Sequence, residues 1–266
     1  MARIARSEGR HLFGTDPAGY DSGRPGHPEA VYEVLVGRCG LRPGTSTLEV
    51  GPGTGQATRR LLELGASPLV ALEPNEDLAD HLVATFGGDI ELVRATVEDA
   101  ELEPESFDLA AAASSFHWVD ENVGLARIDR TLRRDGWIAL WWTLFGDGDA
   151  PDAFVRATSP LLAGLESSPT KGEPGRPRHA RDVAARVAAL ERAGFVDVEH
   201  ELFRWEASWD TAGIRALYGS FSPVLRLDEL RRNALLDEIA AIAERDFDGR
   251  VERTLSTLLY TARQPG

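Results

Sequence analysis

The stretch Leu48-Glu49-Val50-Gly51-Pro52-Gly53-Thr54-Gly55 decides the fold, because it joins a short apolar run to three alternating glycines. Residues 46–50 have the pattern of a buried strand, and the apolar spacing after Gly55 is helical. Glycine adopts backbone conformations closed to other residues and lets a bound molecule approach the chain. Open α/β sheets bind ligands at the carboxyl ends of their strands, so this stretch predicts a ligand site. Alone, the same glycines are also compatible with a simple tight turn.

Strands and helices alternate on both sides of this stretch. The sequence predicts five strands before residue 145, at residues 46–50, 68–72, 90–93, 107–113 and 136–143. A helix is expected from Pro28 to Gly40, and Asn75 is expected to cap another that ends at Gly87. Parallel strands need a helix to return the chain, so this alternation predicts a parallel sheet covered on both faces.

The two flanking regions are less regular. Residues 1–26 lack periodicity and are expected to form an arm with little structure of its own. Residues 146–178 have the composition of a long loop. In the remaining sequence, a helix is predicted at residues 181–194 and a strand at 196–205. A helical region is predicted at 210–247 and a last strand at 255–262.

The composition of the chain argues against several classes of partner. The 43 acidic and 29 basic residues give a net charge of -14, which disfavours a nucleic-acid partner, and Lys171 is the only lysine. The single cysteine, Cys39, cannot form an internal disulfide, and no metal site is expected because no Cys/His group has zinc spacing. The single cysteine fits a reducing cytoplasm, and because there is no run of about 18 apolar residues we expect no membrane partner.

Glu73 is the second informative residue, since it ends the second predicted strand 22 residues after Gly51. A carboxylate in that place can accept hydrogen bonds from both hydroxyls of a ribose, although an ordinary glutamate ahead of a helix is the simpler interpretation. Dinucleotide sites carry Gly-x-Gly-x-x-Gly, whereas here the glycines alternate as Gly-x-Gly-x-Gly. The glycine turn and Glu73 together indicate a nucleoside-containing cofactor, and the glycine spacing disfavours a dinucleotide.

At these residues the chain resembles the class I, Rossmann-like S-adenosylmethionine-dependent methyltransferases, from about residue 20 to residue 145. The resemblance implies S-adenosylmethionine as the cofactor. The segment Ser114-Ser115-Phe116-His117-Trp118 is similar to a variant in a small-molecule branch that includes trans-aconitate methyltransferase-type enzymes. The residues that the resemblance places around the cofactor are Tyr20, Arg24, Glu49, Gly51, Gly53, Gly55, Glu73, Pro74, Thr96, Val97, Glu98, Ser114 and Ser115.

For two of these residues, the sequence leaves more than one role open. Thr96 stands where many relatives have an aspartate, so the group that holds the adenine amino group is Glu98, Asp99 or only backbone amides. Arg24 lies in a segment similar to one that covers the cofactor in this branch. It can pair with the cofactor carboxylate or with an acidic substrate, or it can be a solvated loop arginine.

The fold implied by the resemblance is a single α/β domain over residues 1–266. Its seven-stranded sheet is mostly parallel, with helices on both faces, an antiparallel last strand and a helical insertion before that strand. We divide the chain into an N-terminal arm and helix, a cofactor-binding core and a C-terminal part, at residues 1–40, 41–145 and 146–266. The insertion, at about residues 205–250, is expected to act as a lid over the acceptor.

Methyl transfer from a sulfonium mainly requires positioning of the acceptor and exclusion of water, so a catalytic base is optional. His117 is the candidate base, because it follows the fourth strand and histidine titrates near neutral pH. The alternative is a hydrogen-bonded wall residue, or one that fixes the rotamer of Trp118. The acceptor pocket is expected to include His117, Trp118, Trp142 and Phe145, although aromatic side chains in such places are more often plain core.

The predicted function is therefore methyl transfer to a small-molecule acceptor, with a carboxylate or hydroxyl oxygen favoured, by a monomer or homodimer. One rival is a nicotinamide-dependent oxidoreductase. The glycine spacing disfavours it, as does the absence of a Tyr-x-x-x-Lys pair around Lys171. The other rival is a regulatory protein that binds the cofactor without turnover.

Overall fold

The computed structural model describes residues 17–146, 151–165 and 177–266. The chain divides into two compact units. The sheet unit comprises residues 27–143, 170–203 and 257–266, and the helical unit comprises residues 1–26, 144–169 and 204–256. The assignment of all 266 residues to one domain stays a prediction.

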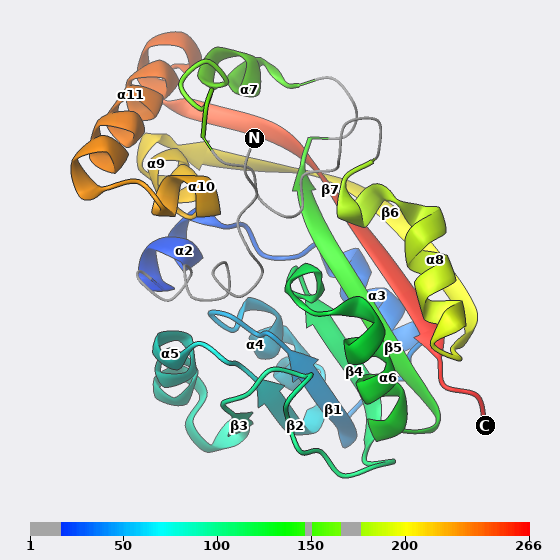
Figure 1. Ribbon diagram of the computed structural model, residues 1–266. Coiled ribbons are helices and arrows are strands. Elements are labelled where there is room, and N and C mark those ends of the chain that lie inside the picture. The colour runs from blue at the N-terminus through cyan, green and yellow to red at the C-terminus, as the bar shows by residue number, and fades with distance from the viewer. Residues whose placement is uncertain (1–16, 147–150, 166–176) are drawn as a thin grey trace. The chain divides into compact units, whose positions relative to one another are not determined.

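A seven-stranded sheet has the order β3-β2-β1-β4-β5-β7-β6 (Figure 1). Strands β1 to β5 pair in parallel, and β7 runs opposite to its neighbours β5 and β6. The strands are β1 (Thr45–Val50), β2 (Ala66–Leu72), β3 (Glu91–Val93), β4 (Phe107–Ala113), β5 (Leu132–Phe145), β6 (Val196–Asp210) and β7 (Arg250–Arg263). The predicted sheet, with its antiparallel last strand, is confirmed.

Helices cover both faces of the sheet, with α6 and α8 towards the viewer and α3 behind (Figure 1). The helices of the sheet unit are α3 (Glu29–Gly37), α4 (Gln56–Glu63), α5 (Glu76–Phe86), α6 (Glu121–Thr131) and α8 (Val183–Arg192). Asn75 caps α5 as predicted, because its side chain accepts a hydrogen bond from the backbone nitrogen of Leu78 at 3.0 Å. Asp120 caps α6 in the same way.

The main core lies between the sheet and helices α3, α4 and α5. Alternate residues of β4 and β5 face it, including Leu109, Ala111, Ala139 and Trp141. The next residue on β5, Trp142, points to the opposite face, where its ring meets that of Tyr260. This alternation is what brings Trp142 to the site described below.

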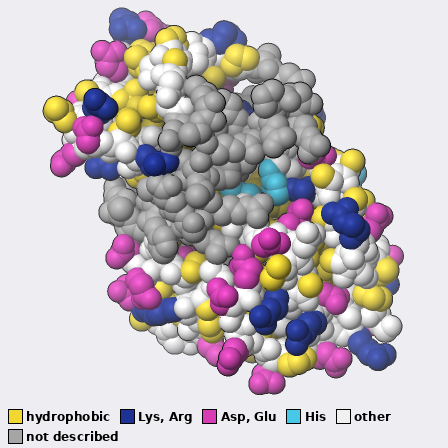
Figure 2. All heavy atoms as spheres, viewed as in Figure 1, with side chains coloured by type: hydrophobic (Ala, Val, Ile, Leu, Met, Phe, Trp, Pro, Cys, Tyr) yellow, Lys and Arg dark blue, Asp and Glu magenta, His cyan; other side chains and the backbone are white. Residues whose placement is uncertain are grey.

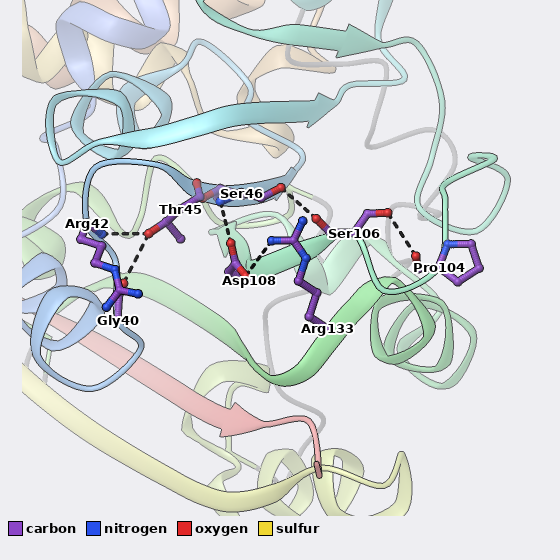
Figure 3. Close-up of polar contacts among 9 residues, drawn as sticks. Gly40, Arg42, Thr45, Ser46, Pro104, Ser106, Asp108 and Arg133 are labelled. Atoms are coloured by element: carbon purple, nitrogen blue, oxygen red, sulfur yellow. Dashed lines mark hydrogen bonds and ion pairs between the residues drawn. The ribbon is translucent and has the colours of Figure 1, made fainter.

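A polar network fastens the amino ends of the strands, at the opposite end of β1 from the glycine turn (Figure 3). The backbone nitrogen of Ser46 donates to Asp108 at 2.9 Å, and Asp108 also pairs with Arg133 at 2.9 Å. The Ser46 hydroxyl donates to the carbonyl oxygen of Ser106 at 2.9 Å. These bonds join β1, β4 and β5 and are structural.

The helical unit has its own apolar core. Its helices are α2 (Pro17–Gly23), α7 (Ala153–Thr158), α9 (Thr211–Gly219), α10 (Ser222–Leu225) and α11 (Glu229–Phe247). Buried side chains from α7, α9 and α11 pack there with Trp209, Val251 and Leu255. The predicted helical insertion is confirmed, because α9, α10 and α11 lie between β6 and β7; its role as a lid stays a prediction.

Two predictions for the flanking regions were wrong. Residues 17–23 of the expected unstructured arm form α2, because Gly23 packs against the backbone of Leu217, where a Cβ atom would lie 2.4 Å from its nitrogen. The expected loop at 146–178 contains α7, which Asp152 caps and the buried Phe154 anchors. The rest of both segments, at residues 1–16, 147–150 and 166–176, lies outside the described residues.

Several predicted boundaries also differ. The region 210–247 is three helices, because the chain leaves helical geometry around Phe221 and Asp228 caps a new helix. β6 and β7 are longer than predicted, since both continue beyond the sheet unit into residues of the helical unit. In the described part of the chain, none of the helices has the length and apolarity that a membrane crossing requires.

Candidate active site

The three glycines of the turn after β1 differ in what surrounds the position that a Cβ atom would occupy. All three have positive φ, at 67° for Gly51, 62° for Gly53 and 87° for Gly55. A Cβ atom on Gly51 would lie 2.6 Å from Cβ of Ser115, and one on Gly55 would lie 2.3 Å from the ring of Phe86. Apart from its neighbours in the chain, no described residue has an atom within 4 Å of the Cβ position of Gly53. Gly51 and Gly55 thus serve packing, whereas Gly53 leaves room for a ligand beside the turn.

Glu49, the last acid of β1, is buried with 1 % of its surface exposed. Its Oε2 atom accepts a hydrogen bond from the Thr58 hydroxyl at 2.7 Å, and its buried Oε1 atom has no hydrogen-bond partner among the described residues. Burial raises the pKa of the Glu49 carboxyl to about 7; the bond from Thr58 opposes this shift, and the charge of Glu73 adds to it. An unsatisfied buried carboxylate oxygen is costly, and a cationic or N–H-bearing ligand would satisfy it.

Glu73, directly after β2, links two loops of the site. Its Oε2 atom accepts a hydrogen bond from the backbone nitrogen of Gly53 at 3.1 Å, and its Oε1 atom accepts one from Asn75 at 2.9 Å. Burial raises the pKa of the Glu73 carboxyl to about 7, against the lowering effect of these two bonds. Each carboxylate oxygen has a second lone pair, so Glu73 can still accept hydrogen bonds from hydroxyl groups.

Thr96 and Glu98, in the loop after β3, both make hydrogen bonds within the protein. The Thr96 hydroxyl donates to Asp99 at 2.7 Å, and Val97 is buried with 1 % exposed. Oε1 of Glu98 accepts a hydrogen bond from the backbone nitrogen of Asp120, at the start of α6, at 3.0 Å. The assignment of Thr96, Val97 and Glu98 to the adenine side stays a prediction.

The chain turns sharply where β4 ends. Ser114 has a positive φ of 55°, and its backbone nitrogen donates to the carbonyl oxygen of Trp141 at 2.7 Å. The Ser115 hydroxyl donates to the carbonyl oxygen of Val50, the last residue of β1. Ser115 therefore ties the carboxyl ends of β1 and β4 together, directly beside Gly51.

His117 follows in a short 3-10 turn, Phe116–Trp118. Its Nδ1 atom accepts a hydrogen bond from the indole nitrogen of Trp142 at 3.2 Å. The Trp118 ring lies beside the imidazole, with 4.8 Å between centroids. The structure thus brings together three of the four residues predicted for the acceptor pocket.

Sequence reasoning missed three residues on this side of the sheet. The ring of His179 meets that of Trp142 edge to face at 5.5 Å, and Nη1 of Arg186 lies 2.6 and 2.7 Å from the two ring nitrogens of His179. Arg186 also pairs with Glu121, with 3.0 Å between Nε and Oε1. No local pattern marks these residues, because they lie on separate elements and meet only in the fold. Figure 2 shows histidine side chains at the surface beside a basic side chain.

Pro74 follows Glu73 in the sheet unit, whereas Tyr20, Arg24 and Phe145 lie in the helical unit. Nε of Arg24 donates to the Ser220 hydroxyl at 2.8 Å, and its guanidinium lies over the rings of Tyr20 and Phe145, at 5.2 and 5.5 Å. On Phe145 there is a second guanidinium, that of Arg253, at 5.3 Å. Tyr20, Arg24 and Phe145 thus form one aromatic and cationic cluster in that unit.

Known proteins match both the sequence and the fold. Residues 48–140 match the model of a methyltransferase domain. An uncharacterized methyltransferase of Schizosaccharomyces pombe is 27 % identical over 256 residues, which cover 95 % of this chain and 96 % of that protein.

Two solved structures illustrate the fold. A candidate type II methyltransferase of Anaeromyxobacter dehalogenans has a TM-score of 0.62 and 22 % identity, over 91 % of this chain and 98 % of that one. Phosphoethanolamine N-methyltransferase 2 of Haemonchus contortus, solved with phosphomonomethylethanolamine and S-adenosylhomocysteine, has a TM-score of 0.56 and 13 % identity. That match covers 99 % of this chain and 61 % of the other.

Proposed function

We propose that this chain, which carries a class I S-adenosylmethionine-dependent methyltransferase domain, transfers the methyl group to an oxygen of a small-molecule acceptor. The observation that carries the proposal is the turn after β1. There the buried Oε1 atom of Glu49 has no partner among the described residues, and Gly53 leaves open space. Together these features fit a cationic nucleoside.

The side chains fit S-adenosylmethionine in three ways. Glu49 and Glu73 supply two buried carboxylates, which suit a ligand with an ammonium and a sulfonium. Glu73 can accept from ribose hydroxyls while it keeps its bonds to Gly53 and Asn75. When bound, the cofactor supplies a methyl group on positively charged sulfur. The remaining predicted contacts, from Tyr20, Arg24, Pro74, Thr96, Val97, Glu98 and Ser114, belong to the same proposal.

A small-molecule acceptor is supported by the residues after β4 and by charge. His117 lies against the indole rings of Trp118 and Trp142, an arrangement suited to a compact acceptor with one polar group. The net charge of -14 disfavours a nucleic acid. We further propose a cytoplasmic protein that acts as a monomer or homodimer.

The residues of the site would act mainly by orienting the acceptor and excluding water. In-line transfer gains roughly 7 to 11 kcal/mol from orientation of the reactants, whereas a general base contributes about 10² to 10⁴-fold in rate. A carboxylate acceptor needs no base, because its oxygen is already ionised. The protonation of the two His117 ring nitrogens therefore decides whether the acceptor can be a hydroxyl group or must be already ionised.

The test has two stages. Calorimetric titration with S-adenosylmethionine, S-adenosylhomocysteine and nicotinamide dinucleotides should show binding of the first two alone. A screen with radiolabelled methyl donor should then show methyl transfer to a carboxylic acid or hydroxyl compound. Dinucleotide binding would support the oxidoreductase, and cofactor binding without transfer to any acceptor would support the regulatory protein.

A further inference from the structure

We propose that Trp142 is a positioning residue that sets the tautomer of His117, so that His117 meets the methyl acceptor as a hydrogen-bond donor. The proposal rests on the proposed function for its acceptor. The part of the proposal that concerns the tautomer of His117 involves only residues of the sheet unit.

The tautomer follows from the chemistry of the two rings. An indole nitrogen can only donate, so the Nδ1 atom of His117, 3.2 Å from Nε1 of Trp142, must accept. A neutral imidazole carries one proton, which therefore resides on Nε2. Protonation of Nδ1 would place two donors face to face. In this state the Nε2 atom of His117 is a hydrogen-bond donor and has no lone pair with which to accept a proton.

Trp142 can impose this state because its own ring is fixed. The side chain is 3 % exposed, and the rings of Tyr260 and His179 meet it edge to face at 6.0 and 5.5 Å. The Tyr260 hydroxyl donates to the carbonyl oxygen of Ala180 at 2.6 Å. This bond anchors to β7 the short turn, His179–Arg181, that carries His179.

His179 is fixed in turn by an ion pair. Arg186 is 9 % exposed and donates to the imidazole, while its Nε and Nη2 atoms meet the carboxylate of Glu121 at 3.0 and 3.1 Å. A guanidinium is only a donor, so a hydrogen bond from Arg186 requires one unprotonated nitrogen in the His179 ring, which is therefore neutral. The chain of contacts from Glu121 through Arg186 and His179 therefore braces the indole that orients His117.

The consequence concerns the acceptor. A donor at Nε2 of His117 can bind a lone pair of the acceptor but cannot remove a proton from it. The methyl-accepting oxygen must then reach the site ionised, as the oxygen of a carboxylate is. In this step the oxygen lone pair forms the bond to the methyl carbon, the carbon–sulfur bond breaks with its electrons going to sulfur, and no proton moves.

The decisive variant is Trp142→Phe, which keeps an aromatic ring and removes the N–H donor. Nitrogen-15 NMR of the cofactor-loaded wild type should show His117 almost entirely as the Nε2–H tautomer, and Trp142→Phe should give a mixture of tautomers. Turnover should fall about 10- to 100-fold, on the scale of a lost hydrogen bond, with cofactor affinity unchanged within about twofold. Trp137→Phe, the same change on the same strand, is the matched control and should alter neither quantity.

The outcomes separate the two proposals. A wild-type spectrum with the proton on Nδ1, or a tautomer that Trp142→Phe leaves unaltered, overturns the inference. So does a changed tautomer with normal turnover. Absence of methyl transfer by the wild type to every acceptor overturns the proposed function instead, and the tautomer measurement stands apart from it.

Discussion

Oε2 of Glu73 lies 3.1 Å from the backbone nitrogen of Gly53, so the acid that ends β2 holds the glycine turn that ends β1. The same carboxylate also accepts a hydrogen bond from the backbone nitrogen of Asn75, so it links the turn after β1 to the start of α5. If Glu73 binds the cofactor as proposed, cofactor binding and the geometry of the turn depend on the same side chain.

Replacement of Glu73 by Gln should weaken S-adenosylmethionine binding by roughly 1 to 3 kcal/mol, the scale of lost charge-assisted hydrogen bonds. The amide nitrogen would also face one of the two backbone donors, of Gly53 or Asn75, that the carboxylate now satisfies. Calorimetry at pH 8 measures the effect, and Glu91→Gln, on the exposed part of β3, is the control. Equal affinity in a folded Glu73→Gln variant would remove Glu73 from the cofactor site.

Glycine replacement should separate backbone strain from ligand contact. Gly40 and Gly53 have similar positive φ, 73° and 62°. In the part of the chain that the structure describes, no atom beyond their sequence neighbours lies within 4 Å of either Cβ position. Either residue changed to Ala should cost about 1 to 2 kcal/mol of stability, because the left-handed conformation is strained for alanine. Only Gly53→Ala should lose cofactor affinity, since only there would the added methyl group enter the proposed site. Denaturant unfolding and calorimetry test the pair, and equal loss of affinity in both variants would contradict the assignment.

Stability without cofactor should depend on pH through Glu49. Its pKa is about 7 in the fold against an ordinary value of 4.5, so the folded chain retains a proton that the unfolded chain releases. The stability from this proton is present below pH 4.5 and is lost as the pH rises through 7. Glu49→Gln, which can still accept from Thr58, should therefore be more stable than the wild type at pH 8.5, by roughly 1 to 3 kcal/mol.

Urea unfolding at pH 5 and pH 8.5 gives this difference directly. The advantage of Glu49→Gln should be clearly smaller at pH 5, where the folded wild type keeps its proton and the pH is only about half a unit above the ordinary pKa of 4.5. An advantage of the same size at both pH values would mean that the charge of Glu49 is not its cause.

Cofactor affinity should rise with pH between 6 and 8. The pKa values of Glu49 and Glu73 are both about 7, and a cationic ligand favours their ionised forms. Each group that must lose its proton reduces the affinity up to about tenfold for each pH unit below its pKa. Calorimetry over this range should show the rise in the wild type and a shallower rise in Glu73→Gln. Parallel profiles would exclude Glu73 as one of the titrating groups.

His117 variants should distinguish a donor from a base. Gln retains an N–H donor but is not a base, whereas Ala is neither. We expect turnover of His117→Gln to stay within about tenfold of the wild type and His117→Ala to fall further, by about 100-fold. If Gln and Ala lose activity equally, and the wild-type rate shows an ionisation that both variants lack, His117 is the base after all.

Much of the fold could be predicted because it rests on short-range patterns. The apolar periods place the strands from Thr45 to Phe145, and Asn75 caps its helix with an atom three residues away. The glycine turn and Glu73 could be recognised for the same reason, since each depends on its position at the end of a strand. Short segments with weak patterns could not. Residues 17–23 form α2, in which Gly23 packs against Leu217, almost two hundred residues further along the chain.

The sequence by itself determined the alternation of strands and helices, the alternating glycines after β1 and the acid after β2, because each is a property of neighbouring residues. Only the tertiary structure decided that Trp142 donates to His117 and that His179, Arg186 and Glu121 stand behind it. Those contacts depend on the face of the sheet to which Trp142 points from β5, and on the pairing of β7 with β5. They join residues whose separation in the chain carries no periodic signal, so burial and hydrogen bonding in the assembled sheet had to select them.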